Sequence, residues 1–103
     1  MQTQPMWIGG RWLPARSGRS FATINPATGE RVGEVALAGA DDVDAAVAAA
    51  LAALPAWSRT SQAERSRVLA RFAASIREHA EAIAQLESIE HGTPISDARH
   101  IVA

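Results

Sequence analysis

The residues that could do chemistry in this sequence include a tight acidic cluster and isolated histidines. Asp41, Asp42 and Asp44 could in principle hold a metal ion. They stand, however, where a helix is predicted to begin, and carboxylates in a first turn are stabilised by the helix dipole. We therefore interpret the cluster as a helix start.

The three histidines, His79, His91 and His100, show neither the His-x3-His nor the His-Glu-x-x-His spacing of a zinc site. The sequence contains no cysteine, which excludes a thiolate metal site, a disulfide and a cysteine nucleophile within these residues. We expect the histidines to lie at helix ends or on the surface.

Arginines are frequent between residues 65 and 77, and a basic helix raises the question of nucleic-acid binding. Glutamates are interspersed among them, and the formal net charge of the whole chain is -1. This pattern is typical of a solvated, salt-bridged helix face, so we expect no nucleic-acid partner. No segment approaches the roughly 20 apolar residues that span a bilayer, and no secretory signal is visible. We expect a cytoplasmic protein without a membrane partner.

The elements that must position any site fall into two parts, and the first consists of short strands and turns. Residues 7–12 place Gly9 and Gly10 between apolar residues, which predicts a two-residue hairpin with Trp7 opposite Trp12. A strand over 21–24, a turn over 25–29 and a strand over 31–38 follow.

The second part is helical. Gly39 is the predicted N-cap of a helix that Pro55 ends, with Trp57 in the connection. Ser61 and Glu64 form the pattern of a capping box, which predicts the start of a second helix. Its expected buried stripe is Val68, Phe72, Ile76 and Ala80.

The apolar rhythm continues beyond the second helix, with a bend near His79, until Gly92. Thr93 is predicted to cap a last helix that has Pro94 at its first position. The 48% hydrophobic content is largely alanine, which buries little area, so we expect a thin core.

In combination, three stretches resemble the amino-terminal end of the NAD(P)-dependent aldehyde dehydrogenase superfamily. They are WIGGRW at 7–12, FATINPATGERVGEVALAGADDVDAAVAAA at 21–50, and the succession from Trp57 to LESIEHGTPISDAR at 86–99. The resemblance covers nearly the whole chain. It implies an α/β fold in which β-hairpins followed by helices form the entry to a Rossmann-type nucleotide-binding domain. Residues 1–38 and 39–103 would both belong to that one domain, which is incomplete in this chain.

The resemblance also implies a reaction, the oxidation of an aldehyde to a carboxylic acid with NAD or NADP. In this family a cysteine thiolate attacks the carbonyl, hydride passes to the nicotinamide, and a glutamate activates water. Those residues and the glycine-containing cofactor turn lie further along the family's chain, so we assign no catalytic and no cofactor-binding residue here. We expect the 103-residue chain alone to be an inactive amino-terminal fragment.

One site of the family matches residues that are present. Some members hold a monovalent cation through backbone carbonyls of a Thr-Ile pair before Asn-Pro and through a carboxylate of a Leu-Glu-x-x-(Asp/Glu)-x-Gly stretch. These positions correspond to Thr23, Ile24 and Glu90, and oxygen ligands suit K⁺ or Na⁺. The alternative is that Glu90 simply faces solvent near the end of its helix.

The resemblance further implies that the whole protein is a homo-oligomer. A second function class stays open, that of a stand-alone interaction module or a remnant without catalysis. A thin core with an uncovered apolar stripe would fit both a dehydrogenase segment and such a module.

Overall fold

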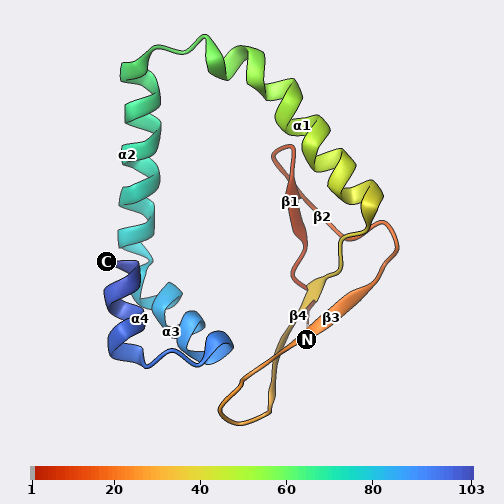
Figure 1. Ribbon diagram of the computed structural model, residues 1–103, viewed down its shortest axis with the longest axis vertical. Helices are drawn as coiled ribbons and strands as arrows, with labels where there is room; N and C mark the ends of the chain where they lie inside the picture. Colours follow the sequence, from red (N-terminus) through yellow and green to blue (C-terminus); the bar gives the residue numbers. More distant parts are fainter. Residues whose placement is uncertain (1) are drawn as a thin grey trace. The chain divides into compact units, whose positions relative to one another are not determined.

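The computed structural model describes residues 2–103, and Figure 1 traces its elements along the chain. The chain divides into two compact units, which are described separately. The first comprises the chain up to Thr23 together with Gly33–Arg59, and the second comprises Ile24–Val32 and Thr60–Ala103. Strands precede helices throughout, which confirms the predicted order of the fold.

The first unit begins with a β-hairpin of β1 (Met6–Ile8) and β2 (Arg11–Leu13). Gly9 and Gly10 adopt φ values of 59° and 77°, the positive angles that a two-residue type I′ turn requires. Trp7 pairs with Trp12 as predicted, with ring centroids 4.8 Å apart and planes inclined by 59°. The hairpin is therefore held by its turn and by a cross-strand aromatic pair.

A second two-stranded sheet is formed by β3 (Ser20–Ile24) and β4 (Arg31–Ala36). Strand β4 ends at Ala36, two residues earlier than predicted. Beyond its end, the Leu37 N–H donates to the Arg19 carbonyl at 2.9 Å. Gln4 forms a parallel bridge with Val35. In this bridge the Gln4 N–H donates to the Glu34 carbonyl at 2.8 Å, and the Ala36 N–H donates to the Gln4 carbonyl at 3.0 Å.

Helix α1 (Ala40–Ser58) starts at the predicted N-cap, Gly39. The Gly39 N–H donates to Oδ2 of Asp42 at 2.9 Å, and the Asp42 side chain is buried. The prediction that Pro55 ends the helix was wrong, because the helix continues to Ser58 and includes Trp57. Pro55 lies in the last turn, so its missing N–H removes one hydrogen bond, and the Ser58 hydroxyl donates to the Pro55 carbonyl at 3.1 Å.

Helix α2 (Gln62–Glu78) carries the predicted capping box. The Glu64 N–H donates to the Ser61 hydroxyl at 3.2 Å, and the Ser61 N–H donates to Oε2 of Glu64 at 2.9 Å. The expected bend at His79 is a full break, since His79 ends α2 and precedes α3 (Ala80–His91). Its ring Nδ1 lies 2.8 Å from the Ser75 carbonyl oxygen, the last-turn position expected of a helix-end histidine.

Helix α4 (Ile95–Val102) has Pro94 as its N-cap, so the predicted cap at Thr93 was one residue too early. Pro94 is extended, with ψ of 137°, and its carbonyl accepts from the Asp97 and Ala98 N–H groups at 2.9 Å each. The Thr93 hydroxyl is engaged elsewhere, 3.3 Å from Oε1 of Glu87. The helix therefore starts where Pro94 can turn the chain without an N–H of its own.

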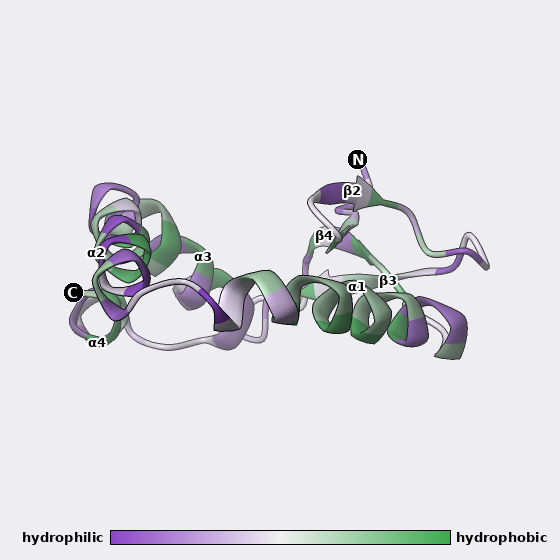
Figure 2. Cartoon of the chain, turned by 90° about the horizontal axis from the view of Figure 1, so that it is seen from above, coloured by the Kyte–Doolittle hydropathy of each residue, from purple (hydrophilic) through white to green (hydrophobic). Residues whose placement is uncertain are grey.

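The core is as thin as the alanine content predicts. Among residues 2–103 the buried apolar residues are all alanines, namely Ala15, Ala36, Ala84 and Ala98. The predicted buried stripe was wrong for Val68 and Phe72, which are 39% and 66% exposed, whereas Ile76 and Ala80 are half-buried. The apolar colour that runs along α1 in Figure 2 is likewise exposed surface. The periodicity places apolar residues along α1 and α2, but it does not by itself bury them.

Helices α3 and α4 pack against each other, and each carries one alanine that is 0% exposed, Ala84 in α3 and Ala98 in α4. Across their exposed side, Arg99 donates to both carboxylate oxygens of Glu81, from Nε at 2.9 Å and from Nη2 at 2.8 Å. These bonds, with a smaller contribution from Gln85, lower the pKa of Glu81 from 4.5 to about 2. The two small side chains allow close approach, and the bidentate pair ties the helices at the surface.

None of the helices described in residues 2–103 is long and apolar enough to cross a membrane.

The capping box makes the stability of α2 sensitive to Ser61. Ser61→Ala removes the acceptor of the Glu64 N–H and should lower the free energy of unfolding by about 0.5–2 kcal/mol. The measurement is denaturant unfolding followed by circular dichroism. Ser66→Ala, at an exposed position of the same helix, is the control and should cost nothing. Equal losses for both variants would contradict the capping role.

The Glu81–Arg99 pair should contribute stability that depends on pH. Because folding lowers the pKa of Glu81, its contribution is fully present above about pH 4.5 and is lost as the pH falls toward 2. The stability difference between wild type and Glu81→Gln should therefore shrink over that range, and high salt should reduce it at neutral pH. Thermal unfolding against pH measures it, with exposed Glu78→Gln as control. A difference that stays constant down to pH 2 would contradict the assignment.

Candidate functional site

The candidate site consists of the three residues predicted to hold a monovalent cation. Thr23 and Ile24 are the last two residues of β3, and Glu90 is the penultimate residue of α3. Thr23 falls in the first unit, whereas Ile24 and Glu90 both fall in the second. The surroundings of Thr23 are therefore those of the first unit, and the surroundings of Ile24 and Glu90 are those of the second.

Thr23 has an unusual environment within the first unit. Its Oγ1 atom is buried, and within residues 2–103 no hydrogen-bond partner lies in reach of it. It faces Gly33, where an added Cβ would lie 3.2 Å from this oxygen. A buried oxygen without a partner is costly, but this is the side-chain oxygen, whereas the predicted ligand of Thr23 is its backbone carbonyl oxygen.

The turn after Ile24 is fixed by local hydrogen bonds. The Asn25 N–H donates to the Glu30 carbonyl at 2.9 Å, and the Gly29 N–H donates to the Asn25 carbonyl at 2.8 Å. Oδ1 of Asn25 accepts from the Ala27 N–H at 2.9 Å, which is an Asx turn. Gly29 takes the positive φ of 74° that the sequence predicts near the end of this turn.

Glu90 is exposed and stands one residue before the end of α3. The helix stops at Gly92, whose φ of 84° is left-handed and whose N–H donates to the Ser88 carbonyl at 3.1 Å. Glu90 therefore presents an exposed carboxylate beside the end of α3. Its carboxylate is the only charged ligand in the predicted set.

A small polar network lies beside Glu90 and was not predicted. Nδ1 of His91 lies 2.9 Å from the Thr93 hydroxyl and 3.5 Å from Oε1 of Glu87. Glu87 and His91 are four residues apart on α3, a spacing that could have identified the pair. The involvement of Thr93 could not be read from spacing, because it depends on how the chain turns after Gly92.

The turn and the helix end of the second unit meet at Pro26 and Gly92. A Cβ added at Gly92 would lie only 3.0 Å from Cγ of Pro26 and 3.9 Å from its Cβ. The Pro26 ring thus occupies the space that a side chain at position 92 would need. This contact brings the segment that follows Ile24 against the residues that follow Glu90.

The other chemistry-bearing residues do not assemble into a site. Within residues 2–103 no group of three or more histidine, aspartate or glutamate side chains could hold a metal ion. Asp42 accepts hydrogen bonds from the N–H groups of Gly39 and Arg16, at 2.9 and 3.3 Å, and so serves its helix start. The predicted site instead consists of the Thr23 and Ile24 carbonyl oxygens and the Glu90 carboxylate. Oxygen ligands of this kind suit hard cations.

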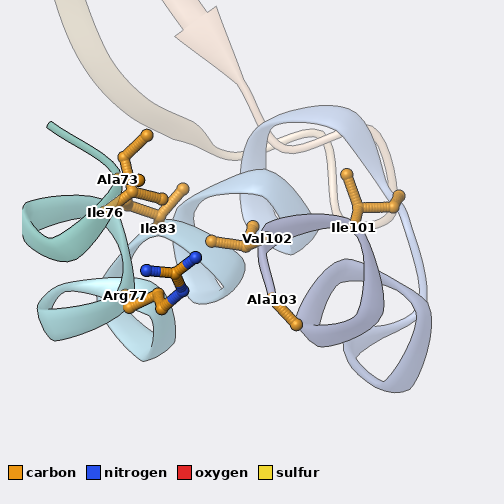
Figure 3. A pocket seen from close by; sticks show the side chains of 7 residues that line it. All are labelled: Ala73, Ile76, Arg77, Ile83, Ile101, Val102 and Ala103. Atoms are coloured by element: carbon orange, nitrogen blue, oxygen red, sulfur yellow. The ribbon is translucent and has the colours of Figure 1, made fainter. Parts of the chain in front are cut away.

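A pocket of about 450 Å³ lies among α2, α3 and α4 in the second unit (Figure 3). Ile76, Ile83 and Val102 line it together with one charged side chain, Arg77. The remaining lining residues are Ala73, Ile101 and Ala103. With one guanidinium and no carboxylate, hydroxyl or imidazole, these walls offer no acid, base or nucleophile.

Comparison with known proteins extends over nearly the whole chain. The model of the aldehyde dehydrogenase family matches residues 12–103. A fluoroacetaldehyde dehydrogenase of Streptantibioticus cattleyicolor is 47% identical over 92 residues, which are 89% of this chain and 18% of that protein.

Solved structures agree with this match. The NAD-dependent aldehyde dehydrogenase of Sinorhizobium meliloti matches with a TM-score of 0.93 and 40% identity, over 98% of this chain and 21% of that one. An NADP-dependent enzyme of E. coli matches with a TM-score of 0.94 and 36% identity, over 97% and 21%.

The 103 residues thus span about a fifth of the length of the relatives they match. The family match begins within β2 and runs through β3, β4, the turn after Ile24 and the helices up to Ala103. It does not favour the alternative of a stand-alone interaction module or a remnant without catalysis. The chain belongs to the aldehyde dehydrogenase family, of which it is an amino-terminal segment.

Proposed function

We propose that the whole protein to which these residues belong oxidises an aldehyde to a carboxylic acid and reduces NAD or NADP. The observation that carries the proposal is the family match over residues 12–103. The names of the relatives support an aldehyde substrate, and the matched structures include one named for NAD and one for NADP.

The 103 residues contribute no catalytic side chain to this proposal. They contain no cysteine, so the thiolate that attacks the aldehyde carbonyl has to come from other residues of the enzyme. A bound nicotinamide would supply the hydride acceptor for this oxidation, and no residue of this chain is assigned to hold it. Within such an enzyme, residues 1–38 and 39–103 would together form the entry to one nucleotide-binding domain.

The same proposal extends to the localisation, oligomeric state and partners of the enzyme. We infer a cytoplasmic homo-oligomer that needs no membrane and no nucleic acid. The interspersed glutamates on α2 support the last point, since Glu64 and Glu78 lie among its arginines and weaken any uniform attraction for phosphates.

The proposal predicts dehydrogenase activity for the whole protein and none for the isolated 103-residue chain. A whole protein that contains residues 1–103 should reduce NAD or NADP with simple aldehydes, whereas the isolated 103-residue chain should not, because it has no cysteine. The measurement is the absorbance of the reduced nicotinamide across a panel of aldehydes, with each cofactor in turn. Turnover by the isolated chain above the buffer background would refute the assignment of roles.

We also propose that carbonyl oxygens of Thr23 and Ile24 and the carboxylate of Glu90 bind K⁺ or Na⁺. Two observations support it: the exposed carboxylate of Glu90 lies next to the end of α3, and the contact of Pro26 with Gly92 brings the segment after Ile24 against the residues after Glu90. Thr23, Ile24 and Glu90 would bind the ion through hard oxygen ligands, and further ligands would come from other parts of the enzyme.

Glu90→Ala tests this cation site. A cation that binds only the folded protein raises its melting temperature with concentration, so KCl should stabilise the wild type more than choline chloride of equal ionic strength. The difference should vanish in Glu90→Ala and persist in Glu78→Ala, a matched loss of an exposed carboxylate on α2. Potassium-dependent stabilisation that survives Glu90→Ala would remove Glu90 from the site.

A further inference from the structure

The Pro26 ring leaves no room for a side chain at position 92. A Cβ at position 92 would meet Cγ of Pro26 at 3.0 Å, whereas carbon atoms in normal contact are about 3.5–4.0 Å apart. The ring can take this position only because residue 92 is glycine. Gly92 also needs its left-handed φ of 84°, so two independent constraints act on one residue.

The position of this contact along the chain connects it with the predicted ligands. Pro26 follows Ile24 by two residues, and Gly92 follows Glu90 by two residues. All four residues belong to the second unit. The contact is therefore the place where the carbonyl-bearing segment and the carboxylate-bearing helix end touch.

Both sides of the contact are held by hydrogen bonds. The Pro26 side is fixed by the Asx turn of Asn25 and by the Asn25–Glu30 bond of 2.9 Å. The Gly92 side is fixed by its 3.1 Å bond to the Ser88 carbonyl in α3. A displacement of Pro26 relative to Gly92 would consequently also move Ile24 and Glu90, each of which is only two residues away.

We propose that Gly92 and Pro26 are positioning residues of the cation site, and that their contact sets the separation between the Ile24 carbonyl oxygen and the Glu90 carboxylate. The inference rests on the cation site proposed above. A methyl group at position 92 would push the Pro26 ring away by several tenths of an ångström. A site whose ligand oxygens have moved apart binds the cation more weakly, even though every ligand is still present.

The test compares glycines that share a backbone conformation but differ in what surrounds them. Gly92→Ala introduces both the left-handed strain and the clash with Pro26. Gly10→Ala, in the first hairpin, introduces the strain alone, because φ is 77° and no atom lies within 4 Å of the added Cβ. The K⁺ concentration that gives half of the maximal thermal stabilisation is measured in the purified protein, with choline chloride as the ionic-strength control.

We expect the half-maximal K⁺ concentration of Gly92→Ala to rise about tenfold or more, as for other residues that orient metal ligands. Gly10→Ala should lower the melting temperature but keep the wild-type K⁺ response. The double variant Gly92→Ala with Pro26→Ala should bind K⁺ more tightly than Gly92→Ala, because it removes the Cγ that the new methyl group meets, but less tightly than the wild type, because it also lacks the contact.

Different failures have different meanings. No specific K⁺ effect in the wild type would overturn the cation site itself, and this inference with it. A normal K⁺ effect in the wild type that Gly92→Ala leaves unchanged would overturn only the positioning role. If Gly92→Ala does not fold, Pro26→Ala is compared with the wild type. This variant removes the contact without creating a clash, so an unchanged half-maximal K⁺ concentration in Pro26→Ala would then overturn the inference.

Discussion

Local hydrogen bonding at turns and helix ends is the constraint on which the rest of this structure depends. The buried apolar residues among 2–103 are four alanines, and an alanine side chain removes little area from water. Elements that cannot rely on a large core have to be specified where they start and stop. The Asp42 carboxylate at Gly39, the Ser61–Glu64 box and the Asn25 turn do so with backbone partners close in sequence.

This dependence explains which parts of the fold could be predicted from the sequence. The Trp7–Trp12 register, the capping box and the stop at Gly92 are set by neighbouring residues, and all were predicted correctly. The errors lie where local signals compete. Pro55 disfavours a helix but costs only one hydrogen bond in a last turn, and Thr93 lost the capping role because its hydroxyl contacts Glu87.

The candidate site shows the same division more sharply. The positions of Thr23, Ile24 and Glu90 came from a resemblance between motifs, and no periodicity in the chain would have selected them. The contact of Pro26 with Gly92 could not be predicted either, because 66 residues separate the two (92 − 26) and only folding brings them together. The resemblance therefore identified the candidate ligands, whereas the contact of Pro26 with Gly92, close to Ile24 and Glu90 in sequence, became visible only in the fold.

The tryptophan pair of the first hairpin has a consequence for spectroscopy. The chain has three tryptophans and no tyrosine, and Trp7, Trp12 and Trp57 all belong to the first unit. Emission excited in the indole band thus reports on that unit and is blind to α2, α3 and α4. Two indoles with centroids 4.8 Å apart also couple their transitions, so the hairpin carries its own chiroptical signature. The indole signal would therefore follow the first unit, whereas the far-ultraviolet signal sums helix α1 of the first unit and helices α2, α3 and α4 of the second.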